Sequence, residues 1–157
     1  MYVKGLKIIE TKRECGTCTK CCEGWLSGTA LGHSFYRGKP CHLVSIGKGC
    51  TVYDQRPQDP CISYTCGWLS FKELPEWMKP SEINAIVDFL SFNNMNYIRI
   101  VEAGESLRAD VLSWIIEYAI KNKFNLYWTV KGANYWIGSD EFCREAANGF
   151  VAKPPFS

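Results

Sequence analysis

Cysteine is concentrated near the start of this chain. Four cysteines fall within eight residues, in the run Cys15-x2-Cys18-x2-Cys21-Cys22, and four more follow at Cys41, Cys50, Cys61 and Cys66. A Cys-x2-Cys spacing lets two thiolates on one tight turn reach the same metal, and a second step of the same length brings in a third sulfur. The pattern therefore indicates a metal site. A segment so rich in thiols, Gly, Pro and Thr cannot fold by apolar burial alone, so we expect its order to come from the metal.

Disulfide bonds are the alternative use for so many cysteines. Disulfide scaffolds are usually shorter than about 100 residues and contain more than about 8–10% Cys, whereas this chain has nine cysteines, an odd number, in 157 residues. Residues 1–10 contain no apolar core of a secretory signal, and no run approaches the roughly 18 apolar residues of a membrane span. We therefore expect a cytoplasmic protein with reduced thiols and no membrane association.

The spacing of the first cysteines favours an iron–sulfur cluster. Three thiols at Cys-x2-Cys-x2-Cys resemble the start of a ferredoxin-type run, in which the fourth ligand arrives from elsewhere in the chain. A [4Fe-4S] cluster would then be held by Cys15, Cys18 and Cys21. The fourth ligand would be Cys22, Cys61 or Cys66.

Zinc is the alternative metal. A second pair, Cys61-x4-Cys66, could complete a four-thiolate site with the first run, and eight clustered cysteines would suffice for one or two Zn²⁺ ions. Neighbouring side chains diverge, so Cys21 and Cys22 are not expected to serve one mononuclear ion together. One of them would face a second site or simply pack.

The other candidate ligands are less constrained by spacing. Cys41 and Cys50 complete the eight cysteines available to one or two centres. His33 and His42 could act as imidazole ligands, but with eight thiols present we expect them to be solvated or hydrogen-bonded. Cys143 lies far along the chain on a predicted helix, so we expect a buried free thiol outside the site.

Three residues between the later cysteines are candidates to surround the centre. Pro57 sets a rigid turn after Arg56, whose guanidinium could offset thiolate charge or bind backbone carbonyls. Tyr53 and Tyr64 could shield the centre from water or pack as ordinary core. Residues 1–67 carry nine Lys and Arg against five Asp and Glu, an excess that matches an anionic metal–thiolate centre. A nucleic-acid partner has little support, because no cluster of bases is interleaved with aromatic residues.

The chain divides into two parts of different character, which predicts an α+β fold. Residues 1–67 lack periodicity and predict a loop-rich lobe, residues 68–80 predict an irregular connector with two prolines, and residues 81–157 predict a small α+β lobe packed on the first. The expected elements of that lobe are a helix over 82–92, a strand over 97–101, a helix over 107–122, a hairpin of 126–130 and 135–137, a helix over 140–147 capped by Ser139, and a loose tail at 153–155.

The cysteines stand in a context shared with a known family. The context comprises Cys15-x2-Cys18-x2-Cys21-Cys22, Pro40-Cys41-His42-Leu43, Gly49-Cys50-Thr51-Val52-Tyr53, Arg56-Pro57, Cys61 and Cys66. Over about residues 13–80 this pattern resembles the YkgJ-type CxxCxxCC family, a zinc- or iron-chelating domain. A related domain occurs in flagellin lysine methylases that carry an iron–sulfur cluster, so the resemblance tilts the implied cofactor towards iron. In a departure from the family spacing, Gln58-Asp59-Pro60 precedes Cys61, and Ile62 replaces an Arg. The resemblance implies metal chelation and no known reaction.

Three classes of function fit these observations: a metal-stabilised interaction module, an iron–sulfur redox protein, and an enzyme assisted by its cluster. The sequence contains no G-x-G-x-x-G after a strand, no P-loop, no G-x-S-x-G and no H-E-x-x-H, so no catalytic motif is visible. We therefore predict a metal-binding protein with a structural or redox [4Fe-4S] cluster, not an enzyme by itself, that serves another protein. The alternative is a zinc-stabilised protein-interaction module without redox activity.

Overall fold

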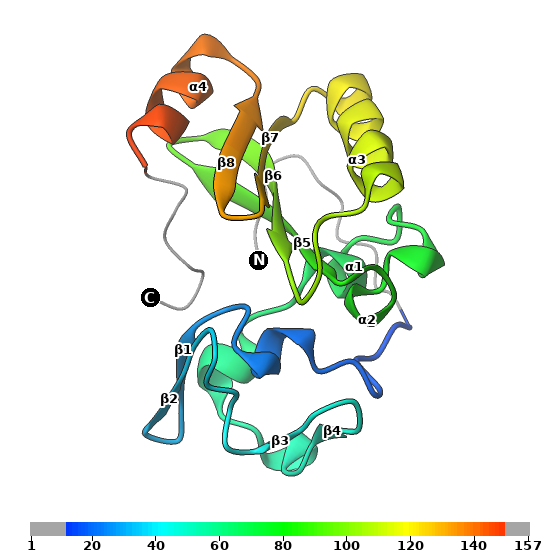
Figure 1. Cartoon of the computed structure of the whole chain (residues 1–157), viewed down its shortest axis with the longest axis vertical. Helices are drawn as coiled ribbons and strands as arrows, with labels where there is room; N and C mark the ends of the chain where they lie inside the picture. Colours follow the sequence, from blue (N-terminus) through cyan, green and yellow to red (C-terminus); the bar gives the residue numbers. More distant parts are fainter. Residues whose placement is uncertain (1–11, 150–157) are drawn as a thin grey trace.

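The computed structural model describes residues 12–149 (Figure 1). The expectations for residues 1–10 and for a loose tail at 153–155 concern residues outside this range. Within it, the α+β class predicted from the sequence is confirmed, because short helices and a sheet occur together. No helix between residues 12 and 149 has the length and apolar character needed to cross a bilayer.

A four-stranded sheet forms the centre of the second part of the chain. Its strands lie in the order β5-β6-β7-β8, and only β6 and β7 run parallel. The crossover between these two parallel strands is α3 (Ala109–Asn122). The strands are β5 (Ala85–Phe92), β6 (Met95–Glu102), β7 (Asn125–Val130) and β8 (Ala133–Ile137). Figure 1 shows α3 and α4 (Asp140–Ala147) on opposite sides of this sheet.

Each face of the sheet is buried by a different apolar cluster. Phe89, Ile98 and Leu126 occupy matching positions on three strands and belong to the main core with α3. On the other face, Tyr97 and Tyr127 pack with the side chains of α4. Because both faces are covered, even the edge strand β5 is buried along most of its length.

Several sequence predictions for this part are confirmed. The strand predicted over 97–101 lies in β6, and the helix predicted over 107–122 is α3, which begins two residues later. The predicted hairpin is β7–β8, whose loop shortens to Lys131 and Gly132, both at positive φ. The predicted last helix is α4, with the Ser139 hydroxyl accepting a hydrogen bond from the amide of Phe142.

The helix predicted over 82–92 is wrong. A short helix, α2 (Pro80–Ile83), ends where Asn84 takes a left-handed conformation with φ 49°, and the chain continues as β5. Ile83, Ile86 and Leu90 mimic a helical period within a run that is apolar on both faces, and periodicity alone cannot separate such a strand from a buried helix.

The segment predicted as an irregular connector, 68–80, is partly helical and contributes to the core. It contains α1 (Gly67–Ser70) and the 3-10 turn η4 (Glu76–Met78). Four of its apolar side chains belong to the main core: Trp68, Phe71, Leu74 and Met78. The predicted division of the chain at residue 67 stays a prediction, but one core includes residues from both sides of it.

Residues 12–66 are dominated by loops. Within this range, the regular structure consists of two small hairpins and three short helical turns. The hairpins are β1 (Gly28–Ala30) with β2 (His33–Phe35), and β3 (Val44–Ser45) with β4 (Gly49–Cys50). The helical turns are η1 (Lys20–Glu23), η2 (Tyr53–Gln55) and η3 (Gln58–Ile62).

Candidate functional site

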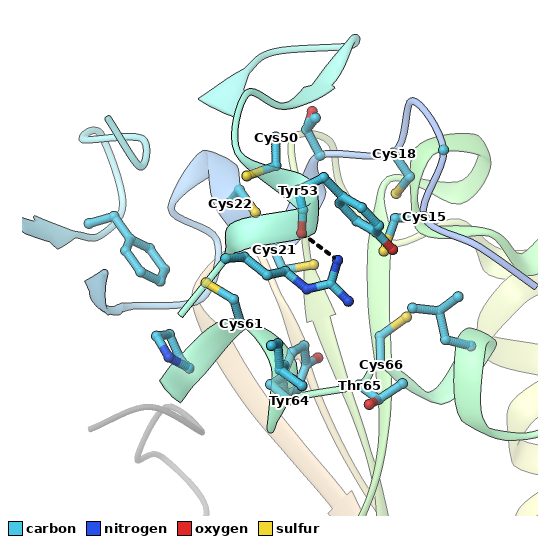
Figure 2. A pocket seen from close by; sticks show the side chains of 17 residues that line it. Cys15, Cys18, Cys21, Cys22, Cys50, Tyr53, Cys61, Tyr64, Thr65 and Cys66 are labelled. Carbon is cyan, nitrogen blue, oxygen red and sulfur yellow. Dashed lines mark hydrogen bonds between the residues drawn. The ribbon is translucent and has the colours of Figure 1, made fainter. Parts of the chain in front are cut away.

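Seven of the eight candidate cysteines line one cavity of about 160 Å³ (Figure 2). They are Cys15, Cys18, Cys21, Cys22, Cys50, Cys61 and Cys66. The eighth, Cys41, is buried behind the wall of the cavity, in an apolar cluster with Cys22 and Cys61. Cysteines as far apart in the sequence as Cys15 and Cys66 are thus gathered around one space, and all nine cysteines of the chain are free thiols.

The first cysteines are held by tight turns. The amide of Cys18 donates to the carbonyl of Cys15 at 2.9 Å, and the turn contains Gly16 at φ 55°. The next turn is η1, fixed by Thr19, which is only 3% exposed. The Thr19 hydroxyl donates to Glu23 and accepts from the amide of Gly47, so it connects the cysteine run to the β3–β4 hairpin. Sequence reasoning missed Thr19, because nothing local signals its long-range bond.

Cys66 reaches the cavity from the side of the sheet. It is 5% exposed and immediately precedes α1, which packs on β5. Gly67 allows this contact, since a Cβ at that position would lie 2.5 Å from the carbonyl oxygen of Val87. A residue with any side chain at position 67 would therefore push Cys66 away from the strand.

The later cysteines are positioned by the small hairpins. The amide of Cys41 donates to the carbonyl of Cys22 at 2.8 Å. Cys50 lies on β4 opposite Val44 of β3, and Val44 packs on the same apolar cluster as Cys22 and Cys61. These contacts bring the four cysteines of this region together although their sequence spacing is irregular.

Among the described residues that line the cavity, Arg56 is the only charged one. Its guanidinium stacks on Tyr53, 3.9 Å from the ring centroid, and donates to the Tyr53 carbonyl at 3.1 Å, the dashed line in Figure 2. Its positive charge acts to lower the pKa of the thiols of Cys15 and Cys22. Arg56 and Tyr53, both expected near the centre, are therefore at the cavity.

Tyr64 lines the cavity at the end of a buried polar chain. Its hydroxyl donates to Asp88 at 2.5 Å, and the other Asp88 carboxylate oxygen accepts from Arg99 at 2.7 Å. Asp88 and Arg99 are 0% and 5% exposed. Burial, followed by the nearby Asp88 charge, raises the pKa of Tyr64, which keeps its proton for this hydrogen bond. Sequence reasoning missed Asp88 and Arg99, because Asp88 fell in the segment predicted as a helix.

Most of the cavity thiols favour the protonated form. Burial raises the pKa of Cys66 to about 12 and that of Cys61 to about 11. The pKa of Cys21 is raised by its hydrogen bond to Cys22, and the same bond lowers the pKa of Cys22. A metal bound here would therefore have to displace protons from several thiols.

The sulfurs surround a space rather than converge on a point. Among residues 12–149, no group of three or more His, Cys, Asp or Glu side chains is close enough to hold one metal ion. The cavity of about 160 Å³ is roughly ten times the ~15 Å³ needed to hold one water molecule. The arrangement has room for a group of several atoms.

The remaining candidates lie away from the cavity. His33 and His42 are exposed, with their ring centroids 4.2 Å apart, and neither lines the cavity. Cys143 lies on α4, as predicted, but is partly rather than fully buried, with its sulfur 3.8 Å from the carbonyl of Gly138.

Comparisons with protein-family models, with curated proteins and with solved structures found no match to this chain. The resemblance to the YkgJ-type family stays a prediction that rests on the sequence pattern over about residues 13–80.

Proposed function

We propose that this chain is a metal-binding protein that holds a [4Fe-4S] cluster in a structural or redox role, as a cytoplasmic member of the YkgJ-type family. The observation that carries the proposal is the gathering of seven free cysteines around one cavity that has room for more than a single ion. Thiolates are the ligands that iron–sulfur clusters require, and the Cys-x2-Cys-x2-Cys run is typical of them. Cys15, Cys18 and Cys21 would supply three ligands.

The other cavity residues suit such a centre. Apolar walls from Phe35 and Leu69 limit the access of water, and Arg56 adds a positive charge beside the thiols. Tyr64 is fixed by Asp88 and presents its ring to the same space. A bound cluster would supply one-electron transfer at a potential set by hydrogen bonds, net charge and solvent exposure. No catalytic residue is assigned, and the partner of such a protein would be another protein.

The test is a measurement of iron, zinc and acid-labile sulfide in protein purified without oxygen. We expect about four iron and four sulfide per chain, with a broad brown absorption. Cys18→Ser should abolish cofactor retention, whereas the matched variant Cys143→Ser, outside the cavity, should retain it fully. Zinc without iron or sulfide would instead support a zinc-stabilised interaction module, and a full iron complement in Cys18→Ser would overturn the ligand assignment.

A further inference from the structure

The adjacent residues Cys21 and Cys22 pack against different apolar clusters. Cys21 packs on the main core, in which Cys66 is buried. Cys22 packs on a separate small cluster of Ala30, Phe35 and Cys41. The two neighbouring thiols are hydrogen-bonded to each other, yet each packs against a different cluster.

The cysteines on the sheet side form a set of four, Cys15, Cys18, Cys21 and Cys66. Cys15 and Cys18 share one tight turn, and Figure 2 shows both on the same side of the cavity as Cys66. Cys21 and Cys66 meet the same core. We call this group the inner set.

The cysteines on the hairpin side form a second set, Cys22, Cys41, Cys50 and Cys61. Cys22 and Cys61 both pack on the cluster that contains Cys41, and the Cys41 amide is bonded to the Cys22 carbonyl. Figure 2 shows Cys22, Cys50 and Cys61 together on the opposite side of the cavity from Cys66. We call this group the outer set.

The electrostatic neighbours of the thiols follow the same division. Burial is the largest cause that raises the pKa of Cys61, and the next causes are the thiols of Cys22, Cys41 and Cys50, all of the outer set. Burial is also the largest cause that raises the pKa of Cys66. It is followed by the charge of Asp88 and then by the thiols of Cys15 and Cys18, both of the inner set. Cys22 lies at the junction, since it also acts on Cys15 and Cys21.

Few buried apolar side chains stabilise the hairpins around the outer set. Their cluster buries three residues, one of which is Cys41 itself, and the described part of the chain contains no disulfide. Small elements that lack a sufficient core are commonly stabilised by a structural metal. Four thiolates from separate loops are the ligand set of a closed structural zinc site.

We propose that the chain holds two four-thiolate centres, a [4Fe-4S] cluster on the inner set and a structural zinc ion on the outer set. The identity of the first centre rests on the proposed function, whereas the division into two sets does not. Cys22 then parallels the last cysteine of ferredoxin runs, which ligates the other cluster of a two-cluster protein. Arg56, whose charge acts on Cys15 of one set and on Cys61 of the other, reduces the repulsion between two anionic centres. Zinc binding would draw the outer sulfurs inward from the positions that they occupy here.

The test compares one variant from each set. Wild-type protein purified without oxygen should contain about four iron, four sulfide and one zinc per chain. Cys61→Ser should lose the zinc and keep the iron and its absorption, whereas Cys15→Ser should lose the iron and keep the zinc. Cys143→Ser should keep both metals.

Two further results keep the proposal testable if a variant is insoluble. X-ray absorption at the zinc edge of wild-type protein should show four sulfur ligands, and fewer would overturn the outer site. Iron with no second metal centre, or equal loss of iron in Cys61→Ser and Cys15→Ser, would overturn the division. Two zinc ions lost separately by the two variants would support the division while refuting the cluster. Eight iron, with half lost in each variant, would support two centres and replace the zinc by a second cluster.

Discussion

The cysteine segment, residues 12–66, and the sheet region, residues 67–149, bury different kinds of side chain. Of the twelve largest fully buried side chains, only Leu26 belongs to the cysteine segment. That segment instead contains eight of the nine cysteines. The sheet region can therefore be stable through apolar burial, whereas the cysteine segment has little apolar burial of its own.

The two regions also differ in how they meet the cavity. The sheet region supports the cavity through Leu69, which lines it, and through Gly67, which lets Cys66, the last residue of the cysteine segment, lie close to β5. The cysteine segment contributes loops whose positions are set by turns and a few long-range hydrogen bonds, such as the one between Thr19 and Gly47. A bound metal would thus fasten a weakly stabilised segment onto a stable one.

The largest expected effect is that of metal removal. Under the proposed function, chelation or acid treatment should unfold the cysteine segment and leave the sheet intact, because only the first depends on the metal. Amide hydrogen exchange read by mass spectrometry should show lost protection over residues 12–66 and retained protection in β5 to β7. Equal loss in both regions would show one cooperative unit, and no loss in either would show that the loops do not need a metal.

A large local effect is expected from Asp88→Asn in the sheet region. The carboxylate of Asp88 pairs with the buried Arg99 and accepts from Tyr64, and removing one partner of a buried ion pair costs about 3–5 kcal/mol. Urea unfolding followed by tryptophan fluorescence would measure the loss. The matched control is Asp110→Asn, in the exposed pair with Arg108, which should change stability little. Similar effects of the two substitutions would contradict the role given to burial.

The gathering of the cysteines was easier to predict from the sequence than the sheet was. The Cys-x2-Cys spacing is a local signal, so the cluster of Cys15, Cys18 and Cys21 could be read directly. Cys50 and Cys61 line the same cavity because of the positions of β4 and η3, which carry them. The spacing of the cysteines does not encode those positions. The sequence indicated that eight cysteines could serve one or two centres, but it did not indicate which of them lie on the same side of the cavity.

The strand β5 shows why the rest was missed. Its burial on both faces removes the alternation of polar and apolar residues that normally marks a strand. A helix over residues 82–92 would not place Asp88 opposite Arg99, because that pairing exists only in the register of β5 with β6. The hydrogen-bonded chain of Arg99, Asp88 and Tyr64 depends on that register, and no local sequence pattern indicates it.

A moderate effect is expected at the joint between the regions, from Arg13→Ala. Arg13 lies two residues before Cys15 and donates to three carbonyls of the segment after Cys66, those of Trp68, Phe71 and Leu74. Hydrogen bonds to a charged group contribute about 1.5–3 kcal/mol, so a loss of this order is expected in chemical denaturation. Arg13→Lys should recover only part of it, because an ammonium cannot match the planar guanidinium. Full stability in Arg13→Ala would mean that the regions are joined elsewhere.

The smallest expected effect concerns the pH dependence of the sheet region. Burial, together with a hydrogen bond to Glu73, raises the pKa of Tyr118 above its ordinary value of about 10. The folded protein then keeps a proton that the unfolded chain loses, so the free energy of unfolding falls as the pH rises above about 10. Tyr118→Phe keeps the ring that stacks on Trp114 and removes the titrating hydroxyl, so its stability should fall less steeply over that range. Urea denaturation between pH 8 and pH 11 would measure the two slopes.

Glu73→Gln should give an intermediate slope, because it removes the nearby negative charge but keeps an acceptor. Equal slopes for the wild type and Tyr118→Phe would show that the alkaline loss comes from other groups, such as Tyr97 and Tyr127, whose pKa values are also raised by burial.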